Sequence, residues 1–314
     1  MGPYGMYEEV RAAGGVAWRP ELNAFVVVGY DDVRAALRDP RLSSAVAGTG
    51  PASGPLAPLV EVLRDQLFLM DPPRHRSLRK LVAKAFTPRS VVALEEGATQ
   101  SCEALLAGFR EGDLVERLAY PFPLQVIARI LGIPAHEEDD FRAWSNAIAA
   151  FVVQMRPSQE VVHGALRAVD AIRPFLRERI RRRADEGGDG DDLLATLLRT
   201  REDGEALTED EVVHTAMQFL IAGHETTTNL LGNIVLAVSR QPGLLARVRE
   251  EPGLGGRVVE ETLRHDPSVQ MVDRVAAEPL ALGGVEVDAG RRVFLAVSGA
   301  NRDPAVFTDP GRFD

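Results

Sequence analysis

Cysteine is nearly absent from this sequence of 314 residues, in which Cys102 is the only thiol. A single cysteine excludes an intrachain disulfide, a four-cysteine zinc site and a cysteine-ligated cluster, so a reducing cytoplasm is the expected setting. Long apolar runs are also missing. The stretch from Ala147 to Val153 is far shorter than the roughly 18 residues of a membrane-spanning helix, and Met1 to Arg11 has no basic segment followed by an apolar one. We therefore expect a cytoplasmic protein without a membrane segment.

Basic residues are fewer than acidic ones, because 36 Lys and Arg stand against 46 Asp and Glu for a formal net charge of -10. This balance argues against a nucleic-acid-binding protein. Both lysines, Lys80 and Lys84, lie in a segment from Pro72 to Leu94 that contains no acidic residue. In this segment His75 and Arg79 are spaced i, i+4, which places them on one helix face where they can hold one anion together. The alternative interpretation is a solvated cationic surface.

The composition, with 45% hydrophobic and 26% charged residues, is typical of a globular protein. Helical spacing of apolar residues dominates after Pro73, whereas strand patterns occur only near the two ends of the sequence. The expected helices are 7–13, 31–37 with Asp31 as its N-cap, 76–86, 90–109, 124–131, 137–151, 159–183, 193–198, 209–240 and 256–265. The expected strands are 24–28, after a turn at Asn23, and 280–287 and 292–296, while residues 45–58 are expected to form a loop. The predicted fold class is therefore mainly α with small β-sheets.

The longest predicted helix begins with a capping box, since Thr208 is followed three residues later by Glu211. Its apolar interior is interrupted by Gly223-His224-Glu225-Thr226-Thr227-Thr228, although glycine and β-branched residues weaken a helix. One interpretation is functional: Gly223 leaves the backbone open to a flat group, and Glu225 beside Thr226 provides the acid and alcohol of controlled proton delivery. The alternative is close helix packing at Gly223 and threonines bonded to i−4 carbonyls. A zinc-protease motif is excluded because position 228 is not histidine.

Several short patterns, each weakly specific, occur in order along the chain. Glu261 and Arg264, for example, have the i, i+3 spacing of many surface salt bridges. The series comprises Met70-Asp71-Pro72-Pro73-Arg74-His75 with Arg79, Leu131-Gly132-Ile133-Pro134, Ala222-Gly223-His224-Glu225-Thr226-Thr227, Glu261-Thr262-Leu263-Arg264, Ala300-Asn301-Arg302-Asp303-Pro304 and Phe307 to Asp314. In this order and spacing the chain resembles the cytochrome P450 family of haem-thiolate monooxygenases, in the soluble bacterial style. The resemblance covers the chain from about Met1 to Asp314 and implies a single P450 domain that is incomplete at its C-terminus.

The resemblance implies haem b (iron protoporphyrin IX) as the cofactor and assigns roles to residues already singled out. His75, Arg79 and Arg274 match positions that bind the haem propionates. The distal side of the haem would be faced by Ala222 and Gly223, with Glu225 and Thr226 guiding protons to iron-bound dioxygen. The other implied positions are Glu261, Arg264 and Arg312 for a buried ion network that steadies the haem-binding core, and Val269, Gln270, Met271 and Val272 for the substrate-lining region.

The implied activity is the hydroxylation or epoxidation of a small hydrophobic substrate with dioxygen. Electrons would come from NAD(P)H through redox partners, and an acidic, ferredoxin-type donor would bind the basic helix from Arg74 to Arg89.

One expected element of the family is missing from these residues. The loop Phe-Gly-x-Gly-x-His-x-Cys-x-Gly, which supplies the axial thiolate, is expected beyond Asp314, so no residue here is predicted to bind the iron. Cys102 does not substitute, because Gln100-Ser101-Cys102-Glu103-Ala104 is an ordinary helical segment. Since O–O cleavage depends on the thiolate, the resemblance implies a fragment that is inactive without the missing loop. The alternative is a non-catalytic P450-like partner protein that binds and supports another enzyme.

Overall fold

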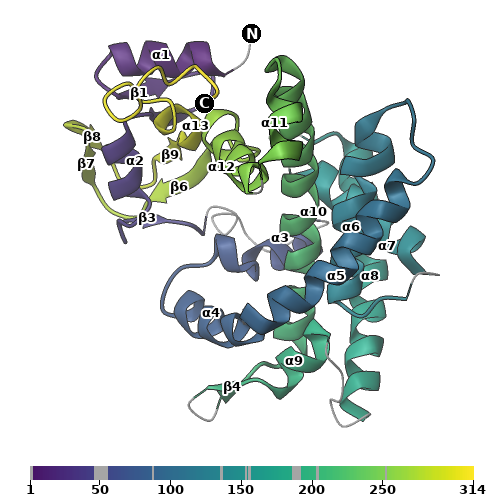
Figure 1. Cartoon of the computed structure of the whole chain (residues 1–314). Coiled ribbons are helices and arrows are strands. Elements are labelled where there is room, and N and C mark those ends of the chain that lie inside the picture. The colour runs from purple at the N-terminus through teal and green to yellow at the C-terminus, as the bar shows by residue number, and fades with distance from the viewer. Residues whose placement is uncertain are drawn as a thin grey trace. The chain divides into compact units, whose positions relative to one another are not determined.

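The structure, a computed structural model, describes residues 3–45, 56–86, 88–134, 137–152, 154, 157–185, 192–202, 205–251 and 253–314. The chain divides into two compact units. Unit 1 consists of residues 1–46 and 229–314, and unit 2 consists of residues 47–228. Figure 1 shows the elements of both units in chain order.

Unit 1 contains a five-stranded sheet with the order β1-β2-β9-β6-β3. Its strands are β1 (Val16–Arg19), β2 (Ala24–Val27), β3 (Leu42–Ser43), β6 (Val272–Ala276) and β9 (Arg292–Leu295). β2 and β9 pair in parallel, with Val26 opposite Phe294, and the other neighbouring strands are antiparallel. A separate hairpin is formed by β7 (Leu280–Leu282) and β8 (Val285–Val287), which are joined by Gly283 and Gly284 at positive φ.

The helices of unit 1 are α1 (Tyr4–Ala12), α2 (Tyr30–Ala36), α11 (Leu244–Glu250), α12 (Leu254–His265) and α13 (Val297–Ala300). Of these, α1 packs on one face of the sheet and α2 on the other. Because side chains alternate along a strand, Val26 and Phe294 belong to a buried cluster with Tyr7 of α1, whereas Val27 and Val293 belong to a second cluster that includes α2. The central strands are therefore apolar on both faces, as expected for a covered parallel pair.

Unit 2 is almost entirely helical. Its helices are α3 (Ala57–Arg64), α4 (Arg74–Ala85), α5 (Pro88–Leu106), α6 (Pro121–Ile130), α7 (Glu138–Val152), α8 (Gln159–Asp185) and α9 (Leu193–Arg199), with short turns η2 (Leu67–Leu69) and η3 (Val115–Ala119) and strands β4 (Arg201–Glu202) and β5 (Glu205–Ala206). The long helix α10 (Glu209–Arg240) begins in unit 2 and ends in unit 1. One cluster of buried apolar side chains joins α3, α4 and α6 to α10.

The capping box at the start of α10 is confirmed. The Thr208 amide donates to Glu211 Oε2 at 2.9 Å, and the Glu211 amide donates to Thr208 Oγ1 at 3.2 Å. In the next turns Val212, Val213 and Ala216 are buried, at the spacing that faces one side of a helix toward a core. From residue 229 to the end of α10 no side chain is buried.

The predicted fold class, mainly α with small β-sheets, is confirmed, but some local predictions were wrong. Asp31 is not an N-cap: α2 begins at Tyr30 after Gly29, and Asp31 lies in the first turn, where its charge suits the helix dipole. α3 and α11 were not predicted, and β6 was implied only by the family resemblance, as the strand that carries Arg274. α11 has no buried residue and β6 has one, so neither carries the periodicity that reveals an element. Of the predicted loop at 45–58, residues 46–55 lie outside the described residues, and α3 already begins at Ala57.

Candidate functional site

The middle of α10 carries a strip of residues that are not fully buried, Ala222, Gly223, Glu225 and Thr226. Ala222 is exposed, and Gly223, Glu225 and Thr226 are half-buried, whereas Ile221 is buried. An exposed alanine beside the buried side chains of the first half of this helix leaves room for a flat group against the helix surface, because a methyl side chain shields little of the backbone.

Gly223 itself packs against α6. A Cβ added at this position would lie 3.1 Å from Cδ1 of Ile127, which is closer than ordinary van der Waals contact, and 3.5 Å from its Cγ1. The close-packing interpretation of Gly223 is therefore confirmed. Its assignment to the cofactor side rests on the family resemblance and stays a prediction.

Glu225 and Thr226 are adjacent on this strip. Burial raises the pKa of the Glu225 carboxyl above its usual value, so the group keeps its proton to a higher pH than an exposed glutamate. Thr226 Oγ1 donates to the carbonyl of Ala222 at 2.6 Å, and Thr228 Oγ1 donates to that of His224 at 3.0 Å. The expected i−4 bonding of threonines is thus confirmed. This bonding leaves the lone pairs of Thr226 Oγ1 available to accept a hydrogen bond from another group.

His224 is an anchor inside unit 2. Its Nε2 lies 3.2 Å from the carbonyl of Tyr120, so Nε2 carries the hydrogen, and Nδ1 accepts from Ser145 Oγ at 3.0 Å. Burial lowers the pKa of the imidazole more than the hydrogen bond to Tyr120 raises it. His224 is therefore held neutral between α7 and the turn before α6. Across the residues with described side chains, no group of His, Cys, Asp and Glu has the arrangement of a metal site.

Helix α4 carries the basic segment. His75 is half-buried and Arg79 is exposed, one turn apart. Neither side chain has a hydrogen-bond or ion-pair partner among the described residues, whereas Arg74 binds Asp65 at 2.9 Å. Two donors on one face without a protein partner suit an anionic ligand. The side chain of Arg89 lies outside the described residues.

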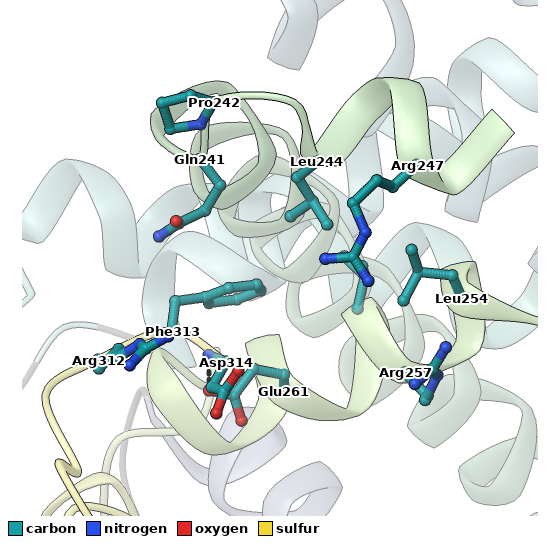
Figure 2. A pocket seen from close by; sticks show the side chains of 11 residues that line it. Gln241, Pro242, Leu244, Arg247, Leu254, Arg257, Glu261, Arg312, Phe313 and Asp314 are labelled. Atoms are coloured by element: carbon teal, nitrogen blue, oxygen red, sulfur yellow. Dashed lines mark hydrogen bonds between the residues drawn. The ribbon is translucent and has the colours of Figure 1, made fainter. Parts of the chain in front are cut away.

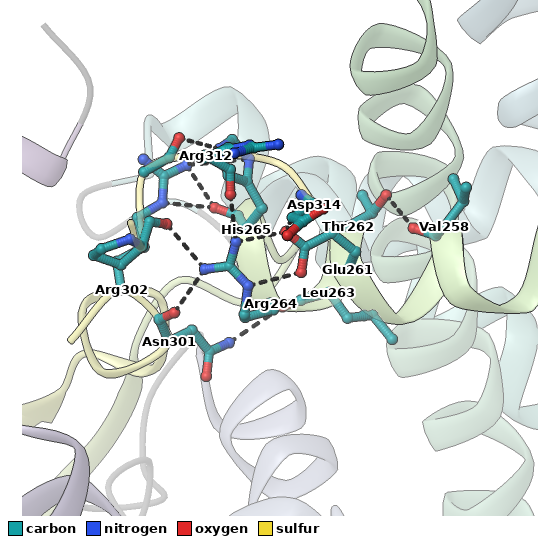
Figure 3. A network of polar contacts seen from close by, with 12 residues as sticks. Val258, Glu261, Thr262, Leu263, Arg264, His265, Asn301, Arg302, Arg312 and Asp314 are labelled. Carbon is teal, nitrogen blue, oxygen red and sulfur yellow. Dashed lines mark hydrogen bonds and ion pairs between the residues drawn. The ribbon is translucent and has the colours of Figure 1, made fainter. Parts of the chain in front are cut away.

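In unit 1, Glu261 and Arg264 of α12 form a two-pronged ion pair (Figure 3). Arg264 Nε donates to Glu261 Oε2 at 2.7 Å, and its NH2 group donates to Oε1 at 2.6 Å. The same guanidinium donates to the carbonyls of Asn301, Pro310 and Arg312 at 3.1, 2.9 and 2.8 Å. Arg312 thus joins the network through its main chain, and its side chain is exposed. The prediction was that Arg312 would join this network with its charged side chain, and the structure differs from it in this respect.

The pKa of Glu261 reflects this network. Burial alone would raise it, but the hydrogen bonds from Arg264 and from the Asp314 amide, together with the charge of Arg264, outweigh burial and lower it. The carboxylate is therefore ionised in the folded protein. The Asp314 amide lies 2.7 Å from Oε1, so the last described residue is tied to α12.

The other predicted residues of unit 1 lie on β6 and the segment before it. Arg274 is half-buried, and its NH1 group donates to the carbonyl of Asp273 at 2.8 Å. Gln270 donates to the carbonyl of Pro267 at 2.6 Å, while Val269 is 44% exposed. The remaining two candidates for the substrate-lining region, Met271 and Val272, are half-buried.

A pocket of about 280 Å³ lies beside the network in unit 1, between α11, α12 and the last three residues (Figure 2). Arg247, Arg257 and Arg312 line it together with Glu261 and Phe313. None of the predicted proton-delivery residues borders this pocket, so it is not the candidate site.

Comparison with known proteins places this geometry in a family. A family model described as cytochrome P450 matches residues 137–252 and 256–314. This chain belongs to the cytochrome P450 family. Cytochrome P450 107B1 of Saccharopolyspora erythraea is 38% identical over 310 residues, which cover 93% of this chain and 73% of that protein. Vitamin D(3) 25-hydroxylase of Pseudonocardia autotrophica is 38% identical over 323 residues, covering 99% of this chain and 76% of that protein.

A solved structure shows the same fold. The crystal structure of P450BioI in complex with an acyl carrier protein ligated to hexadec-9Z-enoic acid has a TM-score of 0.91 and 31% identity, and the match covers 99% of this chain and 80% of that chain. The P450 fold is thereby confirmed. By family the protein is an oxidoreductase that uses haem iron, dioxygen and electrons from a redox partner. No described helix is both long and apolar enough to span a lipid bilayer.

Proposed function

We propose that this P450 is a haem-dependent monooxygenase that hydroxylates or epoxidises a small hydrophobic substrate, with Glu225 and Thr226 delivering protons. The observation that carries the proposal is the strip on α10, where the exposed Ala222 adjoins a hydroxyl and a carboxyl whose pKa is raised by burial. A general acid works best when its pKa lies near the working pH, and this shift moves Glu225 in that direction. The pair also favours an enzyme over a non-catalytic partner protein, which has no use for it.

The residues present suit haem in two respects. His75 and Arg79 offer donors on one helix face with no described partner, as a propionate requires, and Arg274 is a third candidate donor on β6. Ala222 offers an uncrowded surface for a flat ring. An axial thiolate is not among these residues, because Cys102, the only cysteine, lies inside α5. We therefore propose that these 314 residues alone do not perform the reaction.

Haem with a thiolate ligand would supply the binding and cleavage of dioxygen, with the electrons coming from the redox partner. The chain's own residues then hold the protons and orient the groups that carry them. Glu225 holds a proton at its carboxyl, and Thr226 Oγ1, whose hydrogen is engaged with the Ala222 carbonyl, has lone pairs that can accept a hydrogen bond. The tie of His224 to Ser145 and Tyr120 fixes the rotation of this helix turn.

The electron donor is proposed to be an acidic, ferredoxin-type protein, itself reduced from NAD(P)H, that binds α4 and the start of α5. Arg76, Lys80 and Lys84 are exposed along α4 and provide the positive charge for such a partner. The hydrophobic class of the substrate is supported by the relatives, since one is named for vitamin D(3) and another was solved with a fatty acyl chain on its carrier protein. We also propose that both units belong to one P450 domain, because α10 runs through both.

The test is the carbon monoxide difference spectrum of the haem-reconstituted chain. We expect no thiolate-type Soret band from the 314 residues, and a thiolate-type band from a chimera that continues, after Asp314, with the corresponding C-terminal part of cytochrome P450 107B1. The matched control is Cys102→Ala in both forms, which should change neither spectrum. A thiolate-type band from the 314 residues that disappears in Cys102→Ala would refute the assignment of the missing ligand.

A further inference from the structure

A polar cluster in unit 2 connects α10 to the segment that leads into α4. His214 and Gln218 lie one turn apart on α10, on the same face. His214 Nδ1 lies 3.0 Å from Asp65 Oδ2, and Gln218 Oε1 accepts from the amide of Leu67 at 2.5 Å. Sequence spacing does not reveal these contacts, because Asp65 and His214 are far apart in the chain. Two successive turns of α10 thus bind the short segment 65–67 through Asp65 and Leu67.

Asp65 also binds the first turn of α4. Arg74 NH1 donates to Asp65 Oδ1 at 2.9 Å, while His214 occupies Oδ2. The two ends of segment 65–74 are therefore joined by the contact between Asp65 and Arg74. Its first residue, Asp65, is also bound to His214 of α10. The Arg74 side chain is 55% exposed, so its contact with Asp65 contributes little by itself. The His214 contact is the stronger of the two, because only 8% of the His214 side chain and 20% of the Asp65 side chain are exposed.

The cluster fixes the tautomer of His214. Its Nε2 lies 3.4 Å from the guanidinium of Arg173 on α8, and a guanidinium only donates, so Nε2 accepts and the hydrogen is on Nδ1, facing Asp65. Protonation would place a second hydrogen on Nε2 against a cation. The charged groups around the imidazole are Asp65 after α3, Glu61 on α3, Arg74 on α4, Arg173 on α8 and Asp210 on α10.

We propose that His214 and Gln218 are positioning residues that hold segment 65–74 against α10, and so keep α4 and its His75 in register with the Ala222–Thr226 strip. His214 performs this role only as the neutral imidazole with its hydrogen on Nδ1. The inference rests on the proposed function in that α4 is taken to bind the cofactor. The pKa of His214 fits this role: burial lowers it more than Asp65 raises it, and Arg173 lowers it further.

The test measures amide hydrogen exchange of the cofactor-free chain, so it does not depend on activity. His214→Leu removes the hydrogen bond to Asp65, and we expect the protection of residues 65–78 to fall about tenfold, the loss of one hydrogen bond to a charged group. His214→Asn places an amide nitrogen near the position of Nδ1 and should restore most of it. Gln218→Leu should act like His214→Leu, whereas Gln218→Glu keeps an acceptor for the Leu67 amide. The control is His163→Leu, an exposed histidine of α8.

Dependence on pH separates positioning from general stability. Because the folded pKa of His214 lies below its ordinary 6.5, protonation costs more in the folded state, and protection of residues 65–78, corrected for intrinsic exchange, should decline as pH falls below about 6.5. In His214→Asn, which cannot titrate there, this decline should be absent. Unchanged protection in His214→Leu, an equal loss throughout unit 2, or the same pH profile in His214→Asn would overturn the proposal.

Haemin titration of the same variants separates the positioning role of His214 and Gln218 from the proposed binding of haem. If the wild type binds haem and His214→Leu weakens that binding about tenfold with His214→Asn near wild type, both proposals are supported. The titration is repeated in the chimera that supplies the C-terminal part with the thiolate. A chimera that binds no haem refutes the proposed cofactor role, while the exchange result still tests whether His214 and Gln218 hold segment 65–74. Haem binding that is equally tight in all variants overturns the positioning role alone.

Discussion

Replacing Arg264 with methionine tests the ion network of unit 1. The guanidinium makes two hydrogen bonds to Glu261 and three to carbonyls, and the two side chains are only 16% and 13% exposed. Removing one partner of a largely buried pair costs about 3–5 kcal/mol, because the remaining charge is left uncompensated. A sum over the five hydrogen bonds of the guanidinium would give a larger loss of stability. We expect the smaller loss because Glu261 keeps its hydrogen bond from the Asp314 amide, and because Arg312 is an exposed residue whose carbonyl can bind water instead.

The two tryptophans make this measurable unit by unit. Trp18 lies on β1 in unit 1, and Trp144 lies on α7 in unit 2, so Trp18 fluorescence in a Trp144→Phe background reports the unfolding of unit 1. Urea unfolding of Arg264→Met should then show a loss of about 3–5 kcal/mol at an unchanged slope. The control is Arg34→Met, whose partner Asp31 is 82% exposed and which should cost less than about 1 kcal/mol. A loss below about 1 kcal/mol in Arg264→Met would refute the reasoning.

The same network predicts an acid dependence of stability. The pKa of Glu261 is lowered in the folded state, so its contribution is complete above the unfolded value near 4.5 and is lost as pH falls through the folded value. The wild type should therefore lose more unit 1 stability than Arg264→Met when urea unfolding, followed by Trp18, is repeated from pH 6 down to the acid range. Parallel curves for the two proteins would contradict the assigned role of Arg264.

Other parts of the chain carry three further predictions. In a haem-loaded form that includes an axial thiolate, Thr226→Ala should consume dioxygen with less product per dioxygen, and an unchanged ratio would argue against proton delivery by its hydroxyl. Arg79→Leu should weaken haemin binding about tenfold, the loss of one charge-assisted contact, while Lys80→Leu, one residue further along α4 and so about 100° away around the helix, should not; equal effects would contradict the propionate assignment. Thr208→Ala should cost about 1 kcal/mol by Trp144 fluorescence, as the loss of an N-cap does, and no loss would contradict the capping box.

Local patterns predicted most of the helical architecture and failed where tertiary contacts decide. The expected boundaries of α10, Glu209 and Arg240, agree with the structure because a capping box and a long apolar interior are both local signals. The N-cap of α2 was misassigned because Asp31 has the right residue type, while the backbone turn that starts the helix is at Gly29. Residue preference for a cap says nothing about which peptide unit leaves the helical conformation.

The candidate site divides in the same way. The pairing of Glu261 with Arg264 follows from i, i+3 spacing, but the three carbonyls that the guanidinium also binds come from residues that are 37 to 48 positions away. The contact of Gly223 with Ile127 is likewise invisible in the sequence, since any helix could pack at that glycine. The order of the motifs identified these residues through the resemblance to the family. Only the fold showed that Arg312 contributes its carbonyl instead of its charge.

The two buried histidines of α10 restrict where protons move along this helix. His214 carries its hydrogen on Nδ1 and His224 on Nε2, and in both rings the other nitrogen already accepts a hydrogen bond. Each imidazole would have to break a buried contact to gain a proton, and burial lowers the pKa of both. Burial acts in the opposite sense on the neighbouring carboxyl, because it raises the pKa of Glu225. Glu225 is therefore the titratable group in the buried part of α10 that burial keeps protonated to a higher pH, and this is the physical reason for proposing that it delivers protons.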